Sequence, residues 1–235
     1  KVLTGGCNIF LGSEAGKEAV GTGSLIDNIA IGKLAGKCLS ETYFNVFIGT
    51  QAGEHASTGH RNILIGHFTG CKGPMTGCNN TFLGEYAGRC NTSGDNNIGL
   101  GELAMGTGVV TGNNNISIGK NAGCSVTGGC YNIFLGMLAG NTNTSGCNNI
   151  AIGCDVELPS ATGNTQLAIG AGATTWISGD SSFNVTLAGI VTAYASGIVS
   201  ATSFYGDGSN LTGTGGETLI TGVTVKEESS TVGTA

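Results

Sequence analysis

A short motif, Asn-Ile-x-Ile-Gly, recurs ten times in this chain of 235 residues and constrains its fold more than any other feature. Successive copies begin 17 to 20 residues apart, and eight of the nine intervals are 17 or 18. Nine copies begin with an asparagine: Asn8, Asn28, Asn45, Asn62, Asn80, Asn97, Asn115, Asn132 and Asn149. A degraded tenth copy begins at Gln166. Such a constant period indicates one structural unit repeated along the chain.

The length of the period selects the architecture. Helical repeats need about 33 residues or more, whereas 17 or 18 residues fit two short strands and two turns. The β-branched residues of the motif favour strands, and the glycine four residues after each asparagine allows a tight corner. Rungs spaced about 4.8 Å apart would give a stack about 48 Å long. We therefore predict an all-β chain, a β-solenoid (β-roll) of about ten rungs.

Composition supports this fold class and excludes several functions. Glycine fills 44 positions without the three-residue period of collagen, and only 10% of the residues are charged, unlike a disordered chain. The net charge is −6, and the nine lysines and arginines are scattered singly, so the clustered cations that bind nucleic acid are missing. No apolar run approaches the roughly 20 residues of a membrane-spanning helix. We expect no nucleic-acid partner and no membrane partner.

The motif also predicts what each column of residues does. The repeated asparagine can donate and accept hydrogen bonds along the stack, so we expect it to form a ladder. Side chains alternate along a strand, and we assign the residues one and three after the asparagine to the interior. The residue between them is then predicted to face outward and form the interface with other copies. That column includes Phe10, Phe47, Leu64, Phe82 and Phe134.

The predicted outward column implies an assembly. Eight of its ten residues are apolar, and a long exposed apolar strip marks an interface. Closed cyclic symmetry is the usual way to cover such a strip. We predict a homotrimer, a parallel rod of three solenoids.

The motif with its flanking glycines resembles the head repeats of YadA-like trimeric autotransporter adhesins, a family that builds a left-handed β-roll with three chains per rod. Those repeats are usually shorter. The longer frame, with Asn-Thr-Ser-Gly at 91–94 and 143–146, is more similar to repeats in tail-fibre and other virion structural proteins of marine bacteriophages. Residues 196–213 resemble a further element of those fibres.

These resemblances imply a structural fibre protein of a virion tail fibre or of another extracellular or cell-surface filament. Its partners would be its own copies and a host-surface receptor, either a glycan or a surface protein. The alternative is the head of a bacterial surface adhesin. We expect a solenoid domain at 1–175, a β-rich cap or intertwined trimeric element at 176–213, and a Gly/Thr/Ser-rich linker or thin fibre at 214–235.

Sequence motifs for chemistry are weak, and we expect no enzyme, cofactor or metal site. A glycan-cleaving site needs paired carboxylates in a cleft, but the candidate pairs fall on turns without an insertion loop. These pairs are Asp95 with Glu102 and Asp155 with Glu157. The three histidines, His55, His60 and His67, fall in different columns of the repeat. Ice binding needs a regular threonine array, whereas threonine occurs here irregularly and mainly in turns.

The nine cysteines leave two alternatives open. Inter-rung or cross-turn disulfides such as Cys130–Cys147 or Cys71–Cys78 would suit an oxidising exterior. Free thiols packed at the corners would suit a protein that folds in a reducing cytoplasm.

Overall fold

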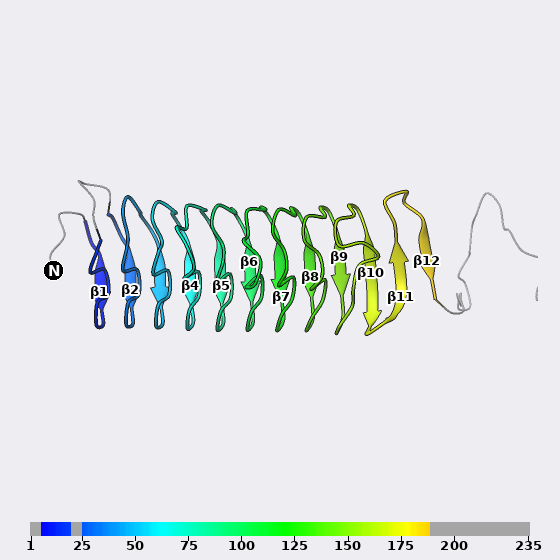
Figure 1. Cartoon of the computed structure of the whole chain (residues 1–235), viewed down its shortest axis with the longest axis horizontal. Helices are drawn as coiled ribbons and strands as arrows, with labels where there is room; N and C mark the ends of the chain where they lie inside the picture. The colour runs from blue at the N-terminus through cyan, green and yellow to red at the C-terminus, as the bar shows by residue number, and fades with distance from the viewer. Residues whose placement is uncertain (1–5, 20–24, 189–235) are drawn as a thin grey trace, which may run out of the picture. The chain divides into compact units, whose positions relative to one another are not determined.

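The computed structural model describes residues 6–19 and 25–188. Twelve strands lie side by side in chain order and form one sheet, and the described residues contain no helix (Figure 1). The predicted all-β class and the β-solenoid are confirmed.

The first ten strands form the solenoid. They are β1 (Ile9–Leu11), β2 (Ile29–Ile31), β3 (Val46–Ile48), β4 (Ile63–Ile65), β5 (Thr81–Leu83), β6 (Ile98–Leu100), β7 (Ile116–Ile118), β8 (Ile133–Leu135), β9 (Ile150–Ile152) and β10 (Leu167–Ala171). Each strand pairs in parallel with the strand one repeat later, and equivalent residues lie side by side, as Ile133 and Ile150 do. Ten strands so joined make about nine turns of coil.

Glycine at the corner after each strand permits this close stacking. The nine glycines from Gly12 to Gly153 in this column have φ between +127° and +142°. An added Cβ at Gly49 would lie 2.3 Å from the carbonyl oxygen of Gly66 in the next rung. An L side chain would therefore meet both an unfavourable φ and the neighbouring backbone, which explains why the column contains only glycine.

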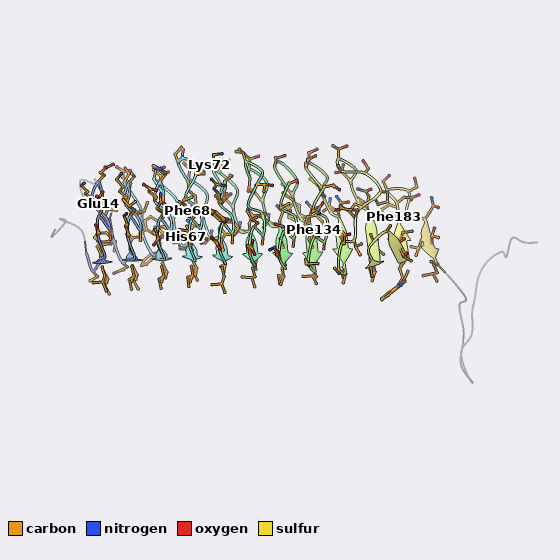
Figure 2. All side chains as sticks on the ribbon, turned by 60° about the horizontal axis from the view of Figure 1, so that its bottom comes forward. Glu14, His67, Phe68, Lys72, Phe134 and Phe183 are labelled. Atoms are coloured by element: carbon orange, nitrogen blue, oxygen red, sulfur yellow. The ribbon has the colours of Figure 1, made fainter. Side chains whose placement is uncertain are left out.

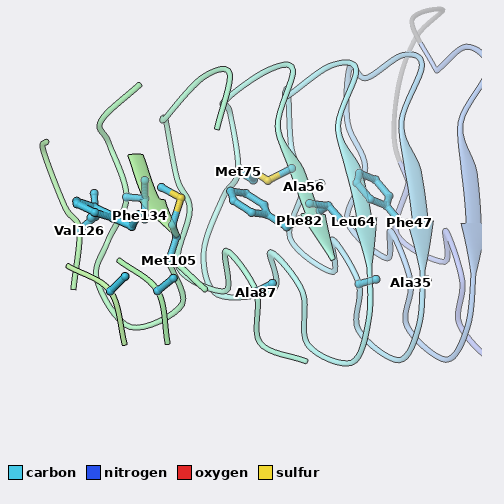
Figure 3. Packing of buried hydrophobic residues seen from close by; sticks show 14 of the residues in the cluster. Ala35, Phe47, Ala56, Leu64, Met75, Phe82, Ala87, Met105, Val126 and Phe134 are labelled. Atoms are coloured by element: carbon cyan, nitrogen blue, oxygen red, sulfur yellow. The ribbon is translucent and has the colours of Figure 1, made fainter. Parts of the chain in front are cut away.

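The middle residue of each strand fills the interior. Phe47, Leu64, Phe82 and Phe134 are completely buried and project into the space that the coils enclose (Figure 3). Phe10, in the first described rung, is partly buried and packs against the same cluster. The sequence prediction that these five residues face outward and form an oligomer interface is wrong.

The reason is the alternation of side chains along the strand. The ladder asparagine is itself buried, and the middle residue follows it by two positions, so both point to the same side. The flanking isoleucines and leucines consequently face outward.

Interior residues compensate for one another in size within a rung. A phenylalanine in the middle position is followed nine residues later by a smaller buried residue, as in Phe47 with Ala56 and Phe82 with Asn91. The order reverses where the middle residue is small, as in Ala30 with the buried Leu39. In these rungs the paired sizes help to keep the core volume similar, as close packing requires.

A second glycine column makes room for the phenylalanines. An added Cβ at Gly88 would lie 2.3 Å from the Phe82 ring, and Gly88 has φ of +53°. In the next rung the middle residue is Gly99, and Met105 occupies the position equivalent to Gly88 and is fully buried. The methionine therefore fills the volume that a phenylalanine takes in other rungs.

Two antiparallel strands end the described sheet. The strand β11 (Thr174–Gly179) pairs with β10, and β12 (Val185–Leu187) pairs with β11. The parallel ladder thus ends at β10, and the expected boundary at residue 175 falls inside β11. Of the expected element at 176–213, residues 189–213 lie outside the described part of the chain, as does the whole expected linker at 214–235.

We predict that Gly88→Ala lowers the free energy of unfolding because it adds a methyl group against Phe82. Gly172→Ala is the matched control, since Gly172 has a similar φ of +57° but no atom within 4 Å of an added Cβ. The free energy of unfolding of the control should fall by about 1–2 kcal/mol, because alanine is unfavourable in the left-handed backbone conformation. Gly88→Ala should lose a further ~1–3 kcal/mol from overpacking. Urea denaturation measures both, and equal losses would contradict this account of the core.

Acid should loosen the turn between β11 and β12. Hydrogen bonds from the side chain and backbone of Asn184, with one from the Ser182 amide, hold the pKa of the Asp180 carboxyl below its ordinary value. The stabilisation is therefore present above the ordinary pKa and is lost as pH falls through the lowered one. Amide exchange at Ser182 and Asn184 should speed up on acidification, beyond the intrinsic pH effect. Asp180→Asn should abolish this extra dependence, and an identical profile in the variant would contradict the assignment.

Candidate functional site

The asparagine ladder runs through the interior as a continuous chain of hydrogen bonds. The Asn132 backbone N–H and side-chain amide both donate to Asn115 Oδ1, at 3.0 and 2.9 Å. Asn115 Nδ2 in turn donates to Asn97 Oδ1 at 3.0 Å and to the Gly129 carbonyl at 2.8 Å. The ladder asparagines from Asn28 to Asn149 are fully buried, and their bonds replace those lost to water. The predicted ladder is present, and its role is to join rungs.

A second ladder, which the sequence analysis missed, lies two positions before the asparagines. At this position a side chain accepts a hydrogen bond from a backbone N–H of the preceding rung. Asp95 Oδ1, for example, accepts one from the Cys78 N–H at 2.6 Å. Asn113 Oδ1 accepts from Asp95 at 2.7 Å, and Cys130 Sγ accepts from Asn113 at 3.2 Å. The recurrence of Asp, Asn and Cys in one column of the repeat was the available signal.

Three of the four carboxylates considered for catalysis have separate structural partners. Asp95 belongs to the second ladder, while Glu102 forms an ion pair with Lys120 at 2.9 Å. Glu157 accepts a hydrogen bond from the Thr142 amide at 3.2 Å. Asp95, Glu102 and Glu157 thus each connect one rung to a neighbouring rung.

One surface pocket combines a thiol and an imidazole, contributed by Cys38 and His55. Burial raises the pKa of the Cys38 thiol above its ordinary value, and a hydrogen bond to the Glu18 carboxylate adds to the effect. The thiol is therefore protonated at neutral pH, whereas the nucleophile in cysteine chemistry is the thiolate. This pocket lacks an activated nucleophile.

The other two histidines belong to aromatic clusters, with His60 half-buried and His67 exposed. The His60 ring stacks on Tyr43 with 3.7 Å between centroids, and His67 lies 3.2 Å from Glu85. Within the described ranges, no group of three or more His, Cys, Asp or Glu residues is placed to hold a metal ion. The same residues include no helix that is long and apolar enough to cross a membrane.

The largest unexplained feature is the outer side of the sheet, which we call the strand face. It consists of the first and third residues of β1–β9 together with Leu167 and Ile169 of β10. All are Ile, Leu or Val except Thr81, and none is charged. Leu11 is 63% exposed, and Leu83 is 47% exposed. Figure 2 shows side chains projecting from the strands along one edge of the whole row.

The strand face continues beyond the solenoid. In the antiparallel ladder Ile177 lies opposite Ile169, and Leu187 lies opposite Ile177. Val185 and Leu187 of β12 are 62% and 48% exposed. These strands form a hairpin rather than another parallel rung, yet the outer side of the sheet remains apolar there.

Strand β11 also carries an exposed tryptophan. A register shift between Ile169 and Gly170 forms a β-bulge that leaves Trp176 without a partner residue in β10. Its side chain is 60% exposed. Bulges often re-aim a side chain, and tryptophan is a frequent anchor at protein interfaces.

The strand face is one continuous patch rather than a set of scattered exposed residues. Ten strands about 4.8 Å apart and three residues wide give a planar footprint of roughly 500 Å². This equals the largest apolar patch of a typical monomer, which is about 300–600 Å² and often functional. We identify the strand face as the candidate interaction surface of the chain.

No protein-family model matches this chain, and no curated protein or solved structure shows a significant match to it. The geometry of the strand face therefore carries the functional argument.

We expect Asn115→Ala to be strongly destabilising because it leaves buried partners of the ladder, including the Asn132 amide and the Gly129 carbonyl, unpaired. An unsatisfied buried polar group costs about 1–3 kcal/mol, so the loss should be at least ~2 kcal/mol. Asn164→Ala is the comparison, since it removes one exposed bond, from the Cys147 amide, worth about 0.5–1.5 kcal/mol. Urea unfolding measures the loss of stability in each variant. A loss for Asn115→Ala that is equal to or smaller than that for Asn164→Ala would refute the role of the ladder.

Proposed function

We propose that this chain is a structural protein, a rigid segment of a trimeric fibre such as a phage tail fibre or a similar extracellular filament. The observation that carries the proposal is the uncharged apolar strand face, which runs along the entire described sheet from β1 to β12. Attachment to a host-surface glycan or protein is the role that we propose for the complete fibre.

The stacking of rungs supports a mechanical role. The asparagine ladder and the backbone pairing join each rung to the next, and the second side-chain ladder runs from His60 to Asn164. The core cluster extends from Ala19 to Ala168. In such arrays each repeat contacts only its neighbours, so the length grows by adding repeats while the cross-section stays the same. The described residues contain regular connections in place of a deep cleft for a substrate.

The strand face is suited to pack against identical copies. Each rung except that of Thr81 presents two Ile, Leu or Val side chains at the same spacing, so parallel copies in register offer matching surfaces along their length. An uncharged face also avoids like-charge repulsion between copies that each carry a net charge of −6. The interface that we propose is thus the strand face, in place of the buried phenylalanine column.

The number of copies rests on the resemblance to trimeric fibres. Cyclic symmetry would place the three strand faces around a common axis and cover all of them at once. A face-to-face dimer would cover the same residues with two copies, so the mass of the assembly distinguishes the two arrangements.

Sedimentation velocity tests the assembly and its interface together. The wild-type chain should sediment as an elongated species of about 70 kDa, three times the 23.3 kDa of one chain. Adding charge to the strand face with the triple substitution Leu83→Lys, Ile98→Lys and Ile118→Lys should give folded monomers. These positions are 36–47% exposed, so the substitutions leave the core intact.

The matched control places three lysines elsewhere in the same rungs, at the exposed positions Thr76, Ser93 and Thr111. This variant has the same net charge as the strand-face variant and should remain trimeric. Circular dichroism checks that both variants are folded. A monomeric or dimeric wild type would refute the trimer, and a strand-face variant that stays trimeric would refute the interface.

A further inference from the structure

Two cysteines are stacked in neighbouring rungs. Cys130 and Cys147 stand two residues before Asn132 and Asn149, and the strands that follow them are paired in register. Cys147 Sγ accepts a hydrogen bond from the Cys130 backbone N–H at 3.1 Å. Neighbouring rungs are about 4.8 Å apart, which falls inside the range of roughly 4.4–6.8 Å between the Cα atoms of disulfide-bonded cysteines.

This pairing is unique among the nine cysteines, all of which lie in the described ranges and are free thiols. Cys78 occupies the same column, but its neighbours in the adjacent rungs are His60 and Asp95. No other two cysteines share a column in consecutive rungs. The chain therefore contains one stacked pair and one isolated thiol in an equivalent backbone position.

We propose that Cys130 and Cys147 form a redox-sensitive site, at which a small-molecule disulfide such as oxidised glutathione creates an intrachain bond between two rungs. The Cys147 thiolate attacks one sulfur of oxidised glutathione and releases the first glutathione thiolate. The Cys130 thiolate then attacks the Cys147 sulfur of the mixed disulfide and releases the second. Two protein thiols are oxidised, and one glutathione disulfide is reduced to two glutathione thiols that carry the two protons.

The structural change that this reaction needs is local. Cys130 Sγ now accepts the Asn113 N–H at 3.2 Å and lies 3.6 Å from the Gly128 carbonyl oxygen. Rotation about the Cα–Cβ bond of Cys130 moves its sulfur away from these groups and toward Cys147 Sγ. Both cysteines are partly exposed, so the oxidant can reach them and water can replace the lost hydrogen bonds.

The bond would tie together the rungs that contain β8 and β9. Closing a loop in this way restricts the unfolded chain and so stabilises the folded rungs. The reaction depends on the stacking of rungs within one chain, and it holds whether the protein is a trimer or a monomer. Reduced chains would fold with free thiols and gain the cross-link on reaching an oxidising exterior.

The test is to incubate the folded 235-residue chain with oxidised glutathione and then map its disulfides without reduction. Cyanogen bromide cleaves after Met137 and so separates Cys130 from Cys147. The two flanking fragments should stay joined until a reductant is added. Cys130→Ser and Cys147→Ser should each abolish the link, while Cys124→Ser and Cys154→Ser, which remove the nearest other thiols, should retain it.

Cys78→Ser provides the matched control within the same column and should leave the link unchanged. The oxidised wild type should also unfold at a higher temperature than the oxidised Cys130→Ser variant. Three results would overturn the proposal: glutathione adducts that persist on the separate cysteines, a bond between chains, or two thiols that stay reduced.

Discussion

The structure depends on the hydrogen bonding of each rung to the next at the spacing of a parallel sheet. This spacing places equivalent residues of successive repeats directly over one another. Residues at one position of the repeat therefore form a column and share one structural role. The buried asparagines show the strength of the constraint, because their amides depend on groups of neighbouring rungs, as Asn115 does on Asn97 and Gly129. A residue that suits its own rung but not the next would interrupt the ladder.

The columns divide the surface and interior of the coil among different residue types. Corner glycines allow neighbouring backbones to approach, and the middle strand residues fill the interior with sizes that compensate across each rung. Outer Asp, Asn and Cys side chains bond to the preceding rung, as Asp95 does to the Cys78 amide. Within the described residues, the strand face is a continuous apolar surface without a partner in the chain, and its apolar columns continue into the antiparallel hairpin.

The solenoid was predicted correctly from the sequence, but the strand residues that face the interior and those that face outward were interchanged. The period and the repeated asparagine and glycine were sufficient for the fold and for the ladder. Both strand sides are apolar, so hydrophobicity alone could not distinguish them. Two signals could have done so: the alternation that places Phe47 on the same side as Asn45, and the size compensation between Phe47 and Ala56. The reversal to antiparallel pairing at β11 had no counterpart in the repeat, because it begins where the period ends.

The central claim is that a regular single-chain coil leaves one apolar side uncovered and that identical copies cover it. Small-angle X-ray scattering on an absolute scale measures the mass per unit length of the wild-type rod in solution. A trimer of parallel coils in register should give three times the mass per length of one coil, which adds one repeat about every 4.8 Å. A mass per length equal to that of a single coil would contradict the claim and would show that the strand face remains open to solvent.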